Sequence, residues 1–176
     1  MALRRVVIAA AVGCAGGCRS ISADEATAFL AVHTDVLDWL QSRLDEIEEL
    51  DVARHTSDGD YLYQGEIVGD PFDGGRIAVD GTGSMQYGAT LVTYDLALDY
   101  DALVYRDQTF DGSLDAQLEL DFTDGLTKQH HASGMLELDG AIRGTADFDY
   151  TLVVRAAGDV LDEQYTGTVA GREITD

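Results

Sequence analysis

Cysteine is nearly absent from this chain of 176 residues. It occurs twice, at Cys14 and Cys18, both close to the N-terminus. The remainder of the chain therefore has no residue that could form a disulfide, a cysteine-based metal cluster or a cysteine nucleophile. Because no cross-link is available there, we expect the folded part to depend on an apolar core for its stability.

Positive charge is also scarce. Eleven Lys and Arg side chains oppose 33 Asp and Glu side chains, so the formal net charge is -22 and the pI is near 4.1. Lys128 is the single lysine. This balance argues against a nucleic-acid partner, which needs a basic surface.

The length fits one domain, and a hydrophobic fraction of 45% is enough to build a core.

The chain has no long hydrophobic run. Its most apolar stretch, Val6 to Val12, follows Arg4 and Arg5 and precedes small residues. This order is typical of an export signal, and the run is shorter than the roughly 20 residues that a membrane-spanning helix needs. We expect residues 1–13 to be an export signal that is removed, residues 14–21 to be an anchor and tether, and residues 22–176 to form one domain.

The tetrapeptide AVGC, residues 11–14, resembles the lipobox of bacterial lipoproteins. In that family the cysteine becomes the acylated first residue of the mature chain. Ala11 departs from the pattern, because leucine is commonest at that place. The resemblance implies lipidation at Cys14, export and anchoring in the cell envelope; Cys18, in AGGC, is the alternative, and an ordinary secretory signal is a second one.

A capping box predicts where the first helix begins. Ser22 and Glu25 have the S-x-x-E spacing, and apolar residues then recur at steps of three and four. We expect an amphipathic helix over about residues 22–55. His33 falls on its apolar stripe, where a lone histidine is more often a hydrogen-bonded core residue than a ligand, and Trp39 lies beside that stripe.

From Tyr61 onward the hydrophobic period changes to two. Such alternation is typical of antiparallel strands with one wet face. Turn signals, including DPFDGG and several Asp-Gly pairs at 80, 111, 124 and 139, separate the runs. The pattern predicts an α+β fold in which one long N-terminal helix packs on a curled antiparallel meander of about seven or eight strands, over about residues 60–175. The meander would form a half or closed barrel. The predicted strands lie near 61–68, 76–80, 84–88, 90–100, 110–122, 129–138, 143–155 and 163–173.

Acidic side chains alternate with the apolar ones on every predicted central strand. Because one rule holds throughout, we interpret these acids as a solvated face and assign no catalytic residue among them. Calcium loops are missing, so only weak binding of cations at the surface is expected.

His130 and His131 are adjacent and would face opposite ways in a strand, which argues against a zinc site. No cofactor is predicted.

Three hypotheses of function remain. The first is an exported, lipid-anchored envelope protein with a non-enzymatic interaction or structural role, whose partner is the membrane through its anchor and an unidentified protein. The second is a carrier of a lipid or other apolar ligand in the curled sheet. Its predicted lining is Phe29, Trp39, Tyr94, Leu96, Phe122, Phe148 and Tyr150, although these side chains would equally suit a filled core. The third is a carboxylate-dependent hydrolase.

Overall fold

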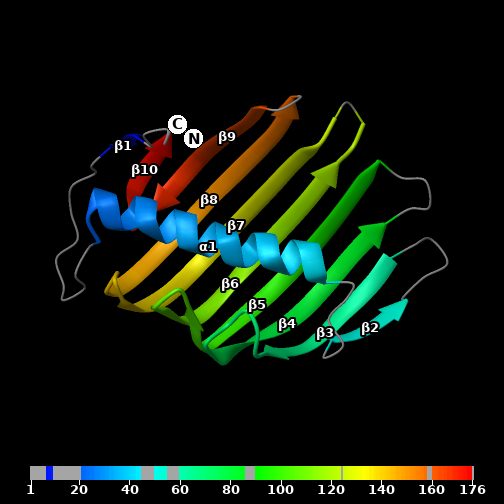
Figure 1. Cartoon of the computed structure of the whole chain (residues 1–176), viewed down its shortest axis with the longest axis horizontal. Coiled ribbons are helices and arrows are strands. Elements are labelled where there is room, and N and C mark those ends of the chain that lie inside the picture. The colour runs from blue at the N-terminus through cyan, green and yellow to red at the C-terminus, as the bar shows by residue number, and fades with distance from the viewer. Residues whose placement is uncertain are drawn as a thin grey trace.

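The computed structural model describes residues 7–9, 21–44, 50–54, 60–85, 90–123, 125–157 and 160–175. Within these residues the chain forms one helix and one ten-stranded sheet (Figure 1). The elements are α1 (Ala23–Arg43), β1 (Val7–Ala9), β2 (Leu50–Arg54), β3 (Asp60–Val68), β4 (Gly74–Met85), β5 (Leu91–Tyr105), β6 (Gln108–Asp121), β7 (Thr127–Gly140), β8 (Gly144–Ala157), β9 (Val160–Val169) and β10 (Arg172–Thr175). The predicted α+β class is confirmed.

The sheet is an antiparallel meander from β2 to β10. Its strand order is β1-β10-β9-β8-β7-β6-β5-β4-β3-β2, so each strand from β2 onward pairs with the next one along the chain. β1 is the exception, because it pairs with β10 and not with the next strand along the chain; Val7 is opposite Thr175. The first and the last strand along the chain therefore lie side by side at one edge of the sheet (Figure 1).

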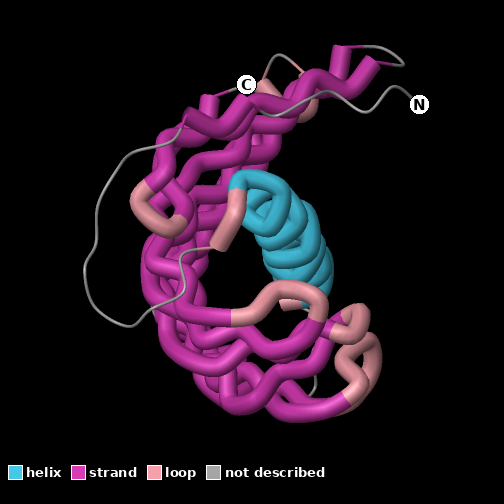
Figure 2. The backbone as a smooth tube through the Cα atoms, turned by 90° about the vertical axis from the view of Figure 1, so that its left-hand side faces the viewer, coloured by secondary structure: helices cyan, strands magenta, loops and turns pink. Residues whose placement is uncertain are grey.

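The sheet curves strongly but stays open. Its two edge strands are β1 and β2, at opposite ends of the strand order. Figure 2 shows the strands following an open arc, with α1 lying inside it. Of the two predicted geometries, the structure therefore has the half barrel, and α1 occupies its concave side.

The helix begins as predicted. Ser22 Oγ accepts a hydrogen bond from the amide of Glu25 at 3.2 Å, and Glu25 Oε2 accepts one from the amide of Ser22 at 2.6 Å. The predicted end at residue 55 is wrong, because Leu50–Arg54 form β2 and pair with residues 61–65 of β3. Residues 45–49 lie outside the described part of the chain. Pairing with a neighbouring strand overrides the helical spacing of this segment.

Two strand boundaries also differ from the prediction. The predicted strand 76–80 and the first two residues of the predicted strand 84–88 belong to one strand, β4, which runs through Gly81 and Gly83. Residues 86–88 of the prediction lie outside the described part of the chain. Conversely, the predicted strand 163–173 is divided into β9 and β10 by a turn at Ala170 and Gly171, whose φ angles are 51° and 71°. Two consecutive positive φ angles are typical of the tight turns that join antiparallel strands.

The Asp-Gly pairs at 80 and 111 are not turns. Both lie inside strands, and a Cβ atom would overlap the carbonyl oxygen of Asp95 at Gly81 and would lie 2.6 Å from that of Met135 at Gly112. These glycines therefore permit a close approach between neighbouring strands, and Gly83 of β4 is a further case. A Cβ atom on Gly83 would lie 2.7 Å from Cδ1 of Tyr94 and 2.8 Å from Cε2 of Tyr63. These two tyrosines are buried and meet edge to face, with their ring centroids 5.7 Å apart.

The alternating pattern divides the sheet into a dry face and a wet one, as predicted. The buried side chains of the central strands include Tyr94, Leu96, Leu98 and Tyr100 of β5, Leu114, Ala116 and Leu118 of β6, Ala132, Leu136 and Leu138 of β7, and Ala146, Phe148, Tyr150 and Leu152 of β8. Almost all of these belong to one core cluster with residues of α1 and its C-cap Leu44. The helix residues are Ala26, Phe29, Leu30, Val36, Leu37 and Leu40. The helix thus supplies the second layer that the apolar face of a sheet requires.

Gly83 offers a test of this packing. We expect Gly83→Ala to lower the free energy of unfolding by about 1–3 kcal/mol, because the new methyl group would lie 2.7 Å and 2.8 Å from two buried aromatic rings, which would have to shift. The melting temperature should fall by about 3–10 °C, as measured by circular dichroism. Gly74→Ala is the matched control, since its Cβ would meet only Cγ2 of Val104, at 3.7 Å. Equal melting temperatures for the two variants would contradict the close-approach role of Gly83.

Candidate functional site

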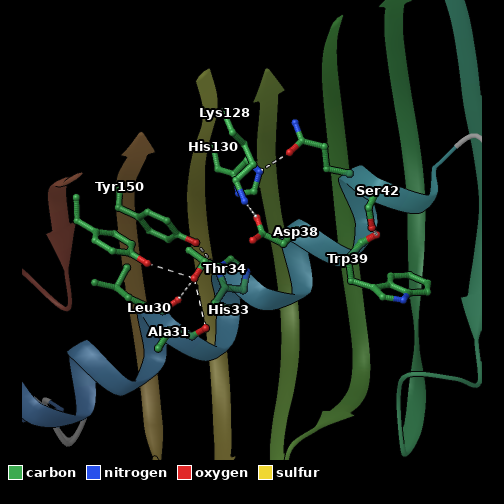
Figure 3. Close-up of polar contacts among 12 residues, drawn as sticks. Leu30, Ala31, His33, Thr34, Asp38, Trp39, Ser42, Lys128, His130 and Tyr150 are labelled. Atoms are coloured by element: carbon green, nitrogen blue, oxygen red, sulfur yellow. Dashed lines mark hydrogen bonds and ion pairs between the residues drawn. The ribbon is translucent and has the colours of Figure 1, made fainter. Parts of the chain in front are cut away.

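Polar side chains interrupt the apolar contact between α1 and the sheet (Figure 3). Four of them lie on α1, namely His33, Thr34, Asp38 and Gln41. His33 and Thr34 are adjacent, and Asp38 and Gln41 follow at steps of four and three residues, so all four lie on the side of the helix that faces β5 to β9. His33 meets Tyr150 from β8, Asp38 meets Lys128 from β7, and Gln41 meets His130 from β7. The hydroxyl of Thr34 lies 3.4 Å from that of Tyr165 from β9. These residues form two neighbouring clusters.

The first cluster is centred on His33. Its Nδ1 atom lies 2.7 Å from the hydroxyl of Tyr150, and its Nε2 atom lies 3.4 Å from the hydroxyl of Tyr100. Phe29 stacks on the ring, with centroids 5.2 Å apart. All four side chains are buried. The prediction that His33 is a hydrogen-bonded core residue is confirmed.

Burial determines the ionisation of this cluster. It lowers the pKa of His33 from the ordinary value of 6.5 to about 3, with a smaller contribution from the charge of His130. Burial also raises the pKa of both Tyr100 and Tyr150. The ring is therefore neutral at physiological pH, and one nitrogen donates a hydrogen bond while the other accepts one. The cluster links α1 to β5 and β8 and is closed to solvent.

The second cluster is centred on His130. Its Nε2 atom lies 2.8 Å from Oε1 of Gln41, and its Nδ1 atom lies 3.4 Å from Oδ1 of Asp38. The same carboxylate oxygen accepts a hydrogen bond from Nζ of Lys128 at 2.6 Å. Within the described residues, His130 Nδ1 and Gln41 Nε2 are buried and make no hydrogen bond.

The pKa of His130 is also lowered, to about 3, by burial first and by the charge of Lys128 second. Asp38 acts in the opposite direction, because a carboxylate favours the charged ring. However, that carboxylate already pairs with the Lys128 ammonium and its side chain is 41% exposed, so burial prevails. His131, next along β7, lies on the other face of the sheet near Thr151 and Asp149, as the strand pattern predicts.

A groove opens beside the second cluster, between α1 and the ends of β7, β8 and β9. Its volume is about 420 Å³. The lining residues are Ala31, Thr34, Asp35 and Asp38 of α1, Leu126 and Lys128 at the start of β7, Leu152, Val154 and Ala156 of β8, and Leu161, Glu163 and Tyr165 of β9. Leu161 is 65% exposed and Leu126 is 42% exposed, so part of the apolar floor is open to water. The size falls in the range of small-molecule sites, which is about 300–1,000 Å³.

The predicted ligand-lining residues do not form this groove. Phe29, Phe148 and Tyr150 are buried in the core, where the rings of Phe29 and Phe148 lie 5.2 Å apart. Tyr94 and Leu96 are buried in the same core, and Trp39 packs partly buried against Phe72, with centroids 5.1 Å apart. Phe122 is 51% exposed at the end of β6. Because α1 occupies the concave side, most of the predicted lining is packed core.

Five residues of the clusters and the groove are not among the candidates that the sequence predicted, namely Thr34, Asp38, Gln41, Lys128 and Glu163. A signal was present, since Thr34 and Gln41 are polar residues at positions i and i+7 among the apolar positions of the helix, and Lys128 is the single lysine. Glu163 carried no such signal, because it is one of many acids. These five side chains come close together only because of the way in which α1 crosses the sheet.

The outer face carries the acids that the sequence predicted to be solvated. Asp95, Asp99, Asp115, Glu137, Asp139, Asp147 and Asp149 are exposed, and Glu119 and Asp121 are half-buried. A shallow trough of about 530 Å³ crosses this face, over small residues such as Ala78, Ala97 and Ser113. Among the described residues, no group of three or more histidine, cysteine or acidic side chains is placed to hold a metal ion.

Comparison with protein-family models, with curated proteins and with solved structures found no match to this chain. Within the described part of the chain, no helix has the length and apolar character to cross a membrane.

The depressed pKa of His130 has a consequence for stability. The unfolded chain binds a proton at this ring below pH 6.5, whereas the folded chain does so only near pH 3. Stability is therefore lost as the pH falls from 6.5 towards 3, by about 2 kcal/mol for one such histidine between pH 7 and 5. We expect His130→Gln to remove about that much of the pH dependence of the free energy of unfolding, measured by urea titration at both pH values.

His131→Gln is the control for this experiment. His131 is adjacent in sequence, but its side chain is 36% exposed on the outer face. Its variant should keep the wild-type loss of stability between pH 7 and 5. If His130→Gln kept that loss as well, the ring would not be held neutral by the fold.

Proposed function

We propose that this protein is exported, lipid-anchored in the cell envelope through Cys14, and that its folded body has a non-enzymatic interaction or structural role. Cys14 and Cys18 lie outside the described residues, so the anchor rests on the leader, in which Arg4 and Arg5, a short apolar run and AVGC follow one another. Val7–Ala9 of that run form β1 in the full chain, so cleavage before Cys14 would remove β1 and leave β10 as the edge strand. Cys18 remains the alternative site of lipidation.

The observation that carries the role of the body is the position of α1. The helix lies inside the arc of strands (Figure 2) and packs against the apolar face of the sheet. The exposed acids lie on the opposite, outer face. Histidine is the side chain best suited to proton transfer near neutral pH, but His33 and His130 are enclosed and hydrogen-bonded to Tyr150 and Gln41. Such an arrangement suits a domain that displays a charged surface. This proposal includes weak binding of cations at that surface.

A carrier of a lipid or other apolar ligand is the second candidate. The groove beside α1 favours it, because exposed Leu126 and Leu161 form part of an apolar floor there. The predicted concavity does not support it, since α1 fills that space. A carrier role would therefore use the groove and not the lining residues that the sequence suggested.

Lipidation is tested with two single variants of the full chain, produced in a bacterium that processes lipoproteins. We expect the wild type to sediment with membranes and Cys14→Ser to be released, because the thiol that carries the lipid is gone. Cys18→Ser is the matched control and should stay with the membranes. Intact-mass measurement of the extracted protein gives the processing site.

Two results would change the assignment. Release of Cys18→Ser with retention of Cys14→Ser would move lipidation to Cys18. Retention of the double variant would contradict a lipid anchor at either cysteine.

A further inference from the structure

We propose that the groove between α1 and the ends of β7, β8 and β9 binds an amphiphilic cation, a molecule with an apolar body and a positively charged head. This proposal deepens the carrier function and rests on it. It does not depend on the lipid anchor, because binding is measured on the purified chain and lipidation by fractionation, so either can fail without the other.

The groove exists because the contact between α1 and the sheet is made of small residues at this point. Ala31 and Thr34 form the helix wall, and Ala156 lies in the floor. Larger side chains at these places would fill the space, as Phe29 and Leu37 do further along the core. The cavity is therefore a consequence of side-chain size at the edge of the helix contact.

The floor of the groove supplies the apolar contact. Leu152, Val154 and Ala156 alternate along β8 on the face that is turned towards α1. Leu161 is paired with Ala156 across β8 and β9 and extends this row to a side chain that is 65% exposed. Exposed apolar side chains that adjoin a cavity are typical of a ligand site.

The walls determine the sign of the ligand's charge. Asp35, Asp38 and Glu163 line the groove, and Lys128 is the one basic side chain among the lining residues. Lys128 is paired with Asp38, and Asp35 is paired with Arg106, which does not line the groove. Glu163 makes no ion pair with any described residue. A cationic head is therefore attracted, and an anionic head is repelled by these acids and by the net charge of -22.

The test is isothermal titration calorimetry of the full chain with octyltrimethylammonium below its micelle concentration. We expect saturable binding at one site, at least about tenfold tighter than the binding of octanoate, which has an apolar body with the opposite charge. Tetramethylammonium, which is the head alone, should also bind at least about tenfold more weakly, since it lacks the apolar contact.

Two pairs of variants locate the site. Leu161→Ser should weaken binding of octyltrimethylammonium at least about fivefold by removing apolar contact, whereas Met135→Ser, at a residue 60% exposed on the outer face, should not. Glu163→Gln should weaken it about threefold to tenfold at low salt, whereas Glu137→Gln, also on the outer face, should not. All four side chains are exposed, so we expect the variants to keep the wild-type melting temperature.

Several results would overturn the proposal. These are equal binding of octanoate, equal effects of Leu161→Ser and Met135→Ser, and only weak binding at many sites that salt abolishes. Failure of octyltrimethylammonium to saturate one site also overturns it, even if a basic peptide binds the groove.

Discussion

The contact of α1 with the concave face of the sheet is the interaction on which the rest of the structure depends. A sheet this curved has an apolar inner face that must be covered, and within the described residues α1 is the helix that covers it. The bond between His33 and Tyr150 joins residues 117 positions apart and holds the helix in register with β8. Because that bond is buried, its two polar groups cannot form hydrogen bonds with water instead. A shift of the helix would leave both without a partner, which costs free energy.

The same contact explains where the surface differs from a uniform acidic shell. On the outer face the acids stand in water, where their interactions with each other and with ions are weak. In the groove, Asp38 and Glu163 lie next to Leu161 and other apolar side chains. Charges beside apolar surface act more strongly on a ligand than charges in open solvent. Exposed apolar side chains and negative charge are thus adjacent at the edge of α1.

The parts of the fold that the sequence predicted well are those that depend on local geometry. Alternation along β5 to β8 assigned the inner and outer side chains, because neighbouring residues of a strand always point to opposite faces. The capping box placed the start of α1 for a similar reason, since Ser22 and Glu25 bond within one turn. The predictions that were wrong concern positions whose structure depends on contact with a segment distant in the sequence. Gly83 looked like part of a turn, but it is a strand residue that makes room for two tyrosines on neighbouring strands.

By itself the sequence determined the α+β class, the two faces of the sheet and the burial of His33 in the helix stripe, because hydrophobic period and capping are properties of short segments. Only the tertiary structure decided that the sheet stays open with α1 inside it, so that Phe29 and Phe148 are core and not the wall of a cavity. It also decided that Asp38 meets Lys128, 90 residues further along the chain, at the side of a groove. The physical reason is that a local pattern sets which way a side chain points, whereas the packing of whole elements sets what it meets.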